Sequence, residues 1–163
     1  MIHLTDEAID LNDVLVHVTA PECGAEVLFV GTTRQFTRQP DSDRELETEF
    51  LTYEAYHEMA MHQLERLEAQ ARQQWPVKRV AIVHRLGKVL PTEASVAVAV
   101  SCPHRSEAFA SAKWLIDTIK HDVPIWKQEH YVQSGPEWIH PTSGSCRCEP
   151  KSSAVSAPQQ QQQ

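Results

Sequence analysis

The chain of 163 residues lacks an excess of positive charge, because its 15 Lys and Arg face 22 Asp and Glu, for a formal net charge of −7. Broad, sequence-independent nucleic-acid binding needs a basic surface, so this class is excluded, whereas a small local pocket of positive charge is not. The longest apolar block, Val96–Val100, has the length of a strand, far below the roughly 18 residues that span a bilayer. The first ten residues lack the basic and apolar regions of a signal peptide. We therefore expect a cytoplasmic protein without membrane contact.

Several motifs with known chemistry are also missing, among them Gly-rich phosphate loops, HExxH and GxSxG. Only four cysteines occur, at Cys23, Cys102, Cys146 and Cys148, and in a reducing compartment they are expected as free thiols. Cys146 and Cys148 form a C-x-C pair near His140, but no second ligand pair accompanies them. We predict neither a metal site nor a cofactor.

The end of the chain differs in composition from the rest. Residues 140–163 are rich in Ser, Pro and Gln, hold few bulky apolar residues and finish in five glutamines. Such a segment cannot bury enough apolar surface to offset the entropy lost on ordering. We predict one folded domain over residues 1–139 and a disordered tail over 140–163.

Hydrophobic periodicity within residues 1–139 indicates alternating elements. Apolar residues at Tyr56, Ala60, Leu64, Leu67 and Ala71 predict an amphipathic helix that Pro76 stops. A second long helix is expected from about Arg105 to His121, ended by Pro124. The other expected elements are a short helix over 11–18, strands over 25–33, 47–56, 77–87 and 94–102, an extended segment over 125–131, and polar connections over 34–45 and 88–93. Strands interleaved with two long helices predict an α/β or α+β sandwich.

Two places where a strand ends could hold an anion or a polar ligand. His104 and Arg105 stand where a strand passes into a helix, and helix N-termini and Arg both suit phosphate. A capping turn with a solvated Arg is the alternative. Gly31, at the other strand end, allows a ligand to approach the backbone, and the residues that follow it could hold a polar ligand. These residues are Thr32, Thr33 and Arg34. An ordinary exit from strand to loop is the alternative there.

The segment from Ile119 to Glu129 places two lysines, Lys120 and Lys127, on either side of Pro124. A turn at the proline can fold Lys127 back towards Lys120, and the neighbouring Trp126 partly desolvates Lys127, which strengthens its attraction for an anion. Two lysines so placed could clamp a phosphate and stabilise a developing oxyanion. The alternative is a ladder of surface ion pairs along the helix.

Five segments of the chain follow one another in the order and spacing of a known family: GTTR, YEAYHEMA, HRLGKVLPTE, VAVAVSCPHRSEAF and DTIKHDVPIWKQE. Through them the chain resembles, over about residues 1–139, the large, catalytic subunit family of molybdopterin synthase. It implies an α+β fold, α/β-hammerhead-like with an additional antiparallel sheet. It also implies a sulfurtransferase of molybdenum cofactor biosynthesis that converts cyclic pyranopterin monophosphate to molybdopterin.

The resemblance also implies partners. The sulfur would come from the C-terminal Gly-Gly thiocarboxylate of a small ubiquitin-like subunit, within a heterotetramer that has a homodimer of this chain at its centre. Because Arg105 and Lys120 are 15 residues apart on one expected helix, about 22 Å, we expect an active site shared between two chains. A non-catalytic binding module for the sulfur carrier or for a phosphorylated ligand is the alternative function.

The family's functional residues map onto this sequence as follows. The catalytic lysines fall on Lys120 and Lys127, and the apolar pocket positions on Phe29 and Ile116. The substrate-binding residues fall on Thr32, Thr33, Arg34, His104, Arg105, Gln128 and Glu129. Many relatives have Lys or Val at the two threonines, and Gly at Thr92, so pocket polarity and one turn are expected to differ. Cys102, beside the His-Arg pair, is interpreted as a core residue at a strand end.

Overall fold

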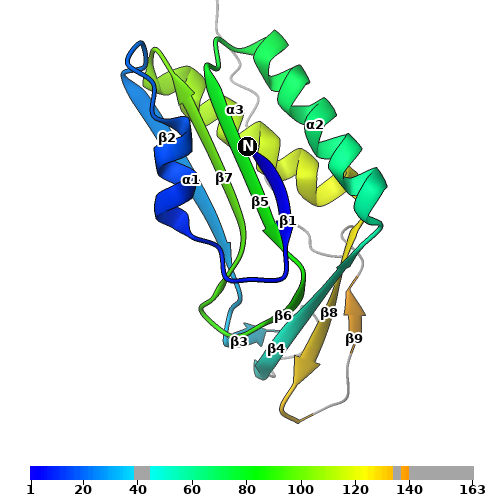
Figure 1. Ribbon diagram of the computed structural model, residues 1–163. Helices are drawn as coiled ribbons and strands as arrows, with labels where there is room; N and C mark the ends of the chain where they lie inside the picture. Colours follow the sequence, from blue (N-terminus) through cyan, green and yellow to red (C-terminus); the bar gives the residue numbers. More distant parts are fainter. Residues whose placement is uncertain (39–44, 134–136, 140–163) are drawn as a thin grey trace, which may run out of the picture.

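The computed structural model describes residues 1–38, 45–133 and 137–139 (Figure 1). The predicted tail, with Cys146 and Cys148, lies outside these residues, so the proposed domain boundary at residue 139 stays a prediction. In chain order the elements are β1 (Ile2–Thr5), α1 (Leu11–Val18), β2 (Ala25–Thr32), β3 (Phe36–Arg38), β4 (Glu45–Ala55), α2 (His57–Gln74), β5 (Arg79–Arg85), β6 (Gly87–Val89), β7 (Ala94–Cys102), α3 (Arg105–Asp122), β8 (Ile125–Tyr131) and β9 (Glu137–Ile139).

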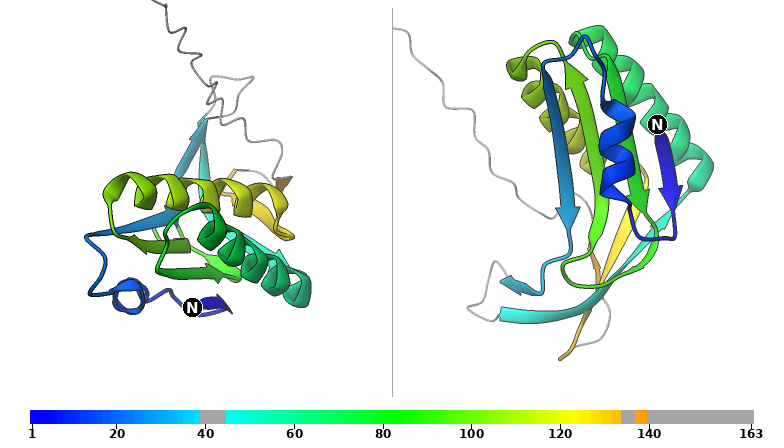
Figure 2. Two further views of the ribbon diagram at one scale, coloured as in Figure 1. Left: turned by 90° about the horizontal axis from the view of Figure 1, so that it is seen from above. Right: turned by 60° about the vertical axis from the view of Figure 1, so that its left-hand side comes forward.

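The first sheet has the strand order β1-β5-β7-β2, with β1 parallel to β5 and the other pairs antiparallel. Helices α2 and α3 cover one face and α1 covers the other (Figure 2). Strand β7 serves both faces: Val96, Val98 and Val100 join the core beneath α2 and α3, whereas Ala97 and Ala99 join the core beneath α1. Because side chains alternate along a strand, the VAVAV block places its large residues towards the two long helices.

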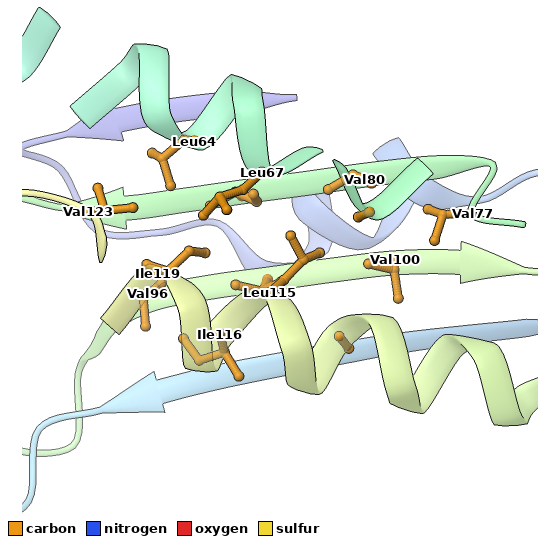
Figure 3. Close-up of a cluster of buried hydrophobic side chains, with 14 of the residues drawn as sticks. Leu64, Leu67, Val77, Val80, Val96, Val100, Leu115, Ile116, Ile119 and Val123 are labelled. Atoms are coloured by element: carbon orange, nitrogen blue, oxygen red, sulfur yellow. The ribbon is translucent and has the colours of Figure 1, made fainter. Parts of the chain in front are cut away.

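The apolar stripes predicted for the two long helices are confirmed. The buried residues are Ala60, Leu64, Leu67 and Ala71 on α2, and Ala108, Ala112, Leu115, Ile116 and Ile119 on α3. In Figure 3 the labelled leucines of α2 and α3 point into the space between the helices and the sheet. Truncation of a fully buried leucine such as Leu64 to alanine costs about 2–5 kcal/mol. Trp75 and Trp114, whose ring centroids are 5.5 Å apart, add a contact between the helices.

Proline sets the end of both long helices. The residues before Pro76 and Pro124 are extended: Trp75 has φ −134° and ψ 157°, and Val123 has φ −80° and ψ 130°. A proline disfavours helical backbone in the preceding residue, which explains both stops. After Val123 the chain therefore turns away from α3 and enters β8.

The second sheet is antiparallel, with the order β3-β4-β8-β9 and β6 paired with β4. It extends from the end of the first sheet where β2 and β7 meet the loops to β3 and β6 (Figure 1). Strand β4 pairs with β8 from Ala55 opposite Ile125 to Thr48 opposite Tyr131. This pairing holds the segment that follows α3 in an extended conformation next to the end of that helix.

Four short strands were not predicted. The expected polar connection over 34–45 is wrong at residues 36–38, which form β3, and the expected connection over 88–93 is wrong at its start, where β6 lies. β1 and β9 were not predicted either. All four are three or four residues long, too short to show a period of their own, and each exists through its pairing with a neighbouring strand. Among the residues that the structure describes, no helix is long and apolar enough to cross a membrane.

Candidate active site

Lys120 lies in the last turn of α3, with its side chain exposed. Its Nζ is 5.8 Å from the centre of the Phe29 ring on β2, within the range of a cation–π interaction. Ile116, one turn earlier on α3, is buried in the core against which Phe29 packs. The two apolar residues that the family resemblance indicates, Phe29 and Ile116, thus belong to one apolar core, and the ammonium of Lys120 lies over the Phe29 ring.

Lys127 lies on β8, opposite Tyr53 of β4, and its Nζ is 2.5 Å from Oε1 of Glu129. Glu129 is only 6% exposed, and the Tyr131 hydroxyl donates a hydrogen bond to its other oxygen, Oε2. These three residues alternate with their neighbours along the strand, so they share one face of the second sheet. A buried carboxylate with both oxygens engaged holds the Lys127 ammonium in place.

The charge of Glu129 follows from its partners. Burial alone would raise the pKa of the Glu129 carboxyl, but hydrogen bonds from Lys127 and Tyr131, with the charges of Lys127 and Arg34, outweigh burial and hold that pKa below its usual value. The charge of Arg34, in the segment after β2, is the smallest of these contributions. Lys127, Glu129 and Tyr131 therefore form one cluster by direct contact, and the charge of Arg34 acts on it.

The end of β2 is fixed by the turn that precedes β7. Thr33 is buried, its N–H donates to the Glu93 carbonyl (3.1 Å), and its own carbonyl accepts from the Thr92 N–H (2.8 Å). Within the described part of the chain, Oγ1 of Thr33 has no hydrogen-bond partner. The neighbouring Thr32 and Arg34 are exposed. These bonds fix the backbone from which the Arg34 side chain extends.

The turn itself is held by an ion pair and contains a strained residue. Arg85 contacts Glu93 at 3.0 Å, and the same carboxylate oxygen accepts from the Leu90 N–H at 2.9 Å. Thr92 has φ +72°, in the left-handed region that favours glycine. Thr92 thus lies in a turn, as expected from the sequence.

The space beside Gly31 is filled by a side chain of β7. A Cβ on Gly31 would lie 2.7 Å from Cγ1 of Val96, which is closer than side-chain atoms approach. The glycine is needed because β7 packs tightly against β2 at this point. The close approach expected at this strand end is thus made by Val96.

His104 and Arg105 are the N-cap and first residue of α3, and both are exposed. Arg105 is separated from Lys120 by 15 residues of continuous helix, about 22 Å along the axis. A single chain therefore does not bring the His-Arg pair to the two lysines.

Gln128 is also set apart from the cluster. It alternates with Lys127 and Glu129 and so faces the opposite side of the second sheet. On that side the next alternate residue, His130, contacts the Thr52 hydroxyl through Nε2 at 3.2 Å. The substrate-binding role expected for Gln128 stays a prediction without support from its neighbours.

Sequence reasoning missed the residues behind the cluster. Tyr53 lies in register with Lys127, and its ring meets that of His84 edge-on, with centroids 5.1 Å apart. Burial lowers the pKa of His84 to about 4, so the ring is neutral at pH 7. Alternation within 47–56 could have assigned Tyr53 to a face, but only the pairing register places it opposite Lys127.

The thiol next to the His-Arg pair belongs to the core. Cys102 is fully buried, as expected of a strand-end core residue. Burial raises the pKa of its thiol, which disfavours the nucleophilic thiolate. Across residues 1–38, 45–133 and 137–139, no group of His, Cys, Asp and Glu could hold a metal ion.

A family model described as MoaE protein matches residues 4–122, a range that contains Phe29, Arg34, the His-Arg pair and Lys120. The chain belongs to the MoaE family. Relatives in this family share much of their length with it. The molybdopterin synthase catalytic subunit of Bos taurus is 41% identical over 138 residues, which is 85% of this chain and 70% of that protein. The subunit of the same name from Halalkalibacterium halodurans is 36% identical over 83% of each chain.

Solved MoaE-family structures have the same fold. The crystal structure of molybdopterin synthase from Staphylococcus aureus matches with a TM-score of 0.76 and 33% identity, over 83% of this chain and 94% of that one. The MoaE protein from Burkholderia ambifaria matches with a TM-score of 0.72 and 33% identity, over 89% and 92%. The expected α+β fold, hammerhead-like with an additional antiparallel sheet, is confirmed.

Proposed function

We propose that this chain is the catalytic subunit of a molybdopterin synthase. It takes sulfur from the C-terminal thiocarboxylate of a small ubiquitin-like subunit and delivers it to cyclic pyranopterin monophosphate, which becomes the dithiolene of molybdopterin. The proposal is supported by the names of relatives that are 36% to 41% identical. The observation that carries it is the placement of two lysines, one above the Phe29 ring and one anchored by a buried carboxylate.

The two lysines have different surroundings and therefore different proposed roles. The Lys127 ammonium is fixed by Glu129, which suits a group that binds and orients the anionic pterin. Lys120 is exposed, and its ammonium lies over the Phe29 ring. Once the thiocarboxylate sulfur has bonded to the pterin, water attacks the carbonyl carbon of the resulting thioester. The tetrahedral oxyanion then collapses, the carbon–sulfur bond breaks, and a carboxylate is left on the small subunit. An ammonium close to the oxyanion stabilises it. We assign this catalytic role to Lys120.

The remaining predicted residues are assigned by position. Arg34, exposed and coupled to Glu129, is proposed to bind the substrate phosphate. Thr32 lies next to it and supplies a hydroxyl, whereas Thr33 is proposed to shape the strand end. Glu129 acts on the substrate through Lys127.

His104 and Arg105 enter the site if a second copy of the chain supplies them. Arg105, Phe109 and Lys120 lie within an arc of about 60° around α3 at 100° per residue, and Lys120 on this flank lies over Phe29 of the edge strand β2. Phe109 is 63% exposed there. Antiparallel packing of two such flanks about a two-fold axis places Arg105 of one copy beside Lys120 of the other. We infer a homodimer with two shared sites, inside the heterotetramer that the small subunit completes.

The catalytic assignment is tested with purified chain, thiocarboxylated small subunit and pterin precursor, by measuring dithiolene product. Lys120→Ala is expected to lose product formation while keeping its fold, because the truncation opens no core cavity. Lys113→Ala is the matched control: Lys113 is an exposed lysine on the same helix that pairs with Asp117, and activity is expected to persist. Normal turnover by folded Lys120→Ala protein refutes the assignment. Product from neither variant nor wild type identifies a non-catalytic binding module.

The shared site is tested by complementation. Arg105→Ala and Lys120→Ala proteins, each inactive, are mixed under conditions in which labelled subunits exchange. A shared site predicts partial recovery, because a mixed dimer contains one pocket with both wild-type halves. Exchange without recovered activity shows that each site lies within one chain.

A further inference from the structure

Tyr131 is the last residue of β8, and it is 6% exposed. Its hydroxyl donates to Oε2 of Glu129, while Oε1 of the same carboxylate contacts Nζ of Lys127. The order along the strand is thus hydroxyl, carboxylate, ammonium, at every second residue on one face. Nothing in the sequence pattern assigns a role to this tyrosine.

A local irregularity of the sheet sets the position of Tyr131. Between Thr48 and Phe50 the register of β4 shifts against β8, so that Tyr131 lies opposite Thr48 while His130 lies opposite Phe50. Such bulges re-aim a side chain and increase the local twist. Beyond the bulge, the Val132 N–H donates to the Glu47 carbonyl at 3.0 Å, so the backbone on both sides of Tyr131 is tied to β4.

The Glu129 carboxylate, between Lys127 and Tyr131, has little conformational freedom. A Glu side chain held at one oxygen can rotate about its last bonds, and a partner at the second oxygen removes that rotation. Hydrogen bonds to a charged group are stronger than neutral ones, and Glu129 is almost fully withdrawn from water. Because Glu129 and Tyr131 are both buried, water does not readily replace the Tyr131 hydroxyl as the hydrogen-bond donor to Oε2 of Glu129.

We propose that Tyr131 is a positioning residue for the sulfur-transfer reaction, which fixes the Lys127 ammonium by holding the carboxylate of Glu129 from its far side. The proposal rests on the proposed function for its kinetic consequence, and on the described contacts alone for its structural one. Tyr131 does not touch the substrate; it acts through two neighbouring side chains of the same strand.

The test is Tyr131→Phe, which keeps the ring and removes the hydroxyl, in the assembled enzyme with its small subunit. Because Lys127 is assigned to binding, the variant is expected to raise the KM for the pterin about tenfold and to change kcat much less. Tyr56→Phe is the matched control, since Tyr56 is an exposed tyrosine outside the cluster. Its KM is expected to equal that of the wild type.

The pH profile separates positioning from packing. The charged and titratable groups that act on or respond to Glu129 are Lys127 and Tyr131 on β8, Arg34 after β2 and Tyr53 on β4. Loss of the Tyr131 hydrogen bond leaves burial less opposed, so the pKa of Glu129 rises. The acid limb of kcat/KM therefore moves to higher pH in Tyr131→Phe, and not in Tyr56→Phe.

Titration of the Glu129 carboxyl by ¹³C NMR, assigned by comparison with Glu129→Gln, gives a readout that needs no turnover. A higher carboxyl pKa in Tyr131→Phe with a raised KM supports the proposal. An unchanged Glu129 titration, or an equal loss of activity at every pH with a lowered melting temperature, overturns it. If the wild type makes no product, the proposed function fails, and the NMR titration still decides whether Tyr131 holds Glu129.

Discussion

Gly31→Ala tests the packing of β2 against β7 where the candidate site begins. The added Cβ would lie 2.7 Å from Cγ1 of Val96 and 3.5 Å from Cε1 of Phe29. Normal contact between carbon atoms begins near 3.5–4.0 Å, so Val96 must move by about an ångström or the strands must separate. Val96 is only 4% exposed and lies in the larger core, so it has little room to move.

Overpacking of this kind costs about 1–3 kcal/mol, which for a domain of this size lowers the melting temperature by roughly 3–12 °C. Urea unfolding, followed by circular dichroism, measures the loss as a shift in midpoint at constant slope. Val96→Ala removes the clashing atom and by itself costs about 1–3 kcal/mol through the space it leaves.

The double variant Gly31→Ala/Val96→Ala decides the cause. If the two side chains clash, the costs of the single variants do not add, because the new methyl occupies part of the space vacated by valine. The double variant is then expected to be at least 1 kcal/mol more stable than the sum of the single changes predicts. Additive costs, or a Gly31→Ala protein as stable as the wild type, would refute the packing explanation for this glycine.

Three further predictions concern stability. The His84 ring stays neutral in the folded chain down to about pH 4, whereas an unfolded histidine binds a proton below about pH 6.5. As the pH is lowered between these values the unfolded state takes up more protons, so the free energy of unfolding falls by about 1.4 kcal/mol per pH unit. Urea unfolding of wild type and His84→Gln should show this slope only in the wild type. Thr92→Gly should stabilise the chain by a few tenths to about 1 kcal/mol by relieving its positive φ, and a lower unfolding midpoint contradicts this. Removal of residues 142–163 should change neither melting temperature nor activity, given their composition, and a drop of several degrees contradicts that prediction.

Local patterns were sufficient for the long elements. The helix stops at Pro76 and Pro124 follow from backbone sterics between neighbours in the chain, and α2 and α3 end within one or two residues of the predicted positions. The strands β2 and β7 carry enough apolar residues to be recognised alone. The strands β1, β3, β6 and β9 were not predicted, because a strand of three or four residues has no period of its own and exists through its partner.

The candidate site, too, could be predicted from the sequence only in part. The residue types of Lys120, Lys127 and Arg34 can be read from the sequence, and the family resemblance supplies their roles. Which of them meet depends on the register of β4 against β8 and on the packing of α3 over β2. For that reason Tyr53 and Tyr131 were missed, and Gln128 was grouped with Lys127 although strand alternation turns it away.

The turn of Val123 and Pro124 has a consequence for insertions and deletions. It joins an element with a period of 3.6 residues to one with a period of two, and the first residue of β8 is set by its pairing with Ala55. One residue added or removed between Asp122 and Ile125 would shift β8 by one position, exchanging the face that bears Lys127 with the face that bears Gln128. Such a shift would also turn the buried Glu129 and Tyr131 to the other face, so a library that varies the length of this short connection should yield inactive chains wherever an odd change in length is transmitted to β8.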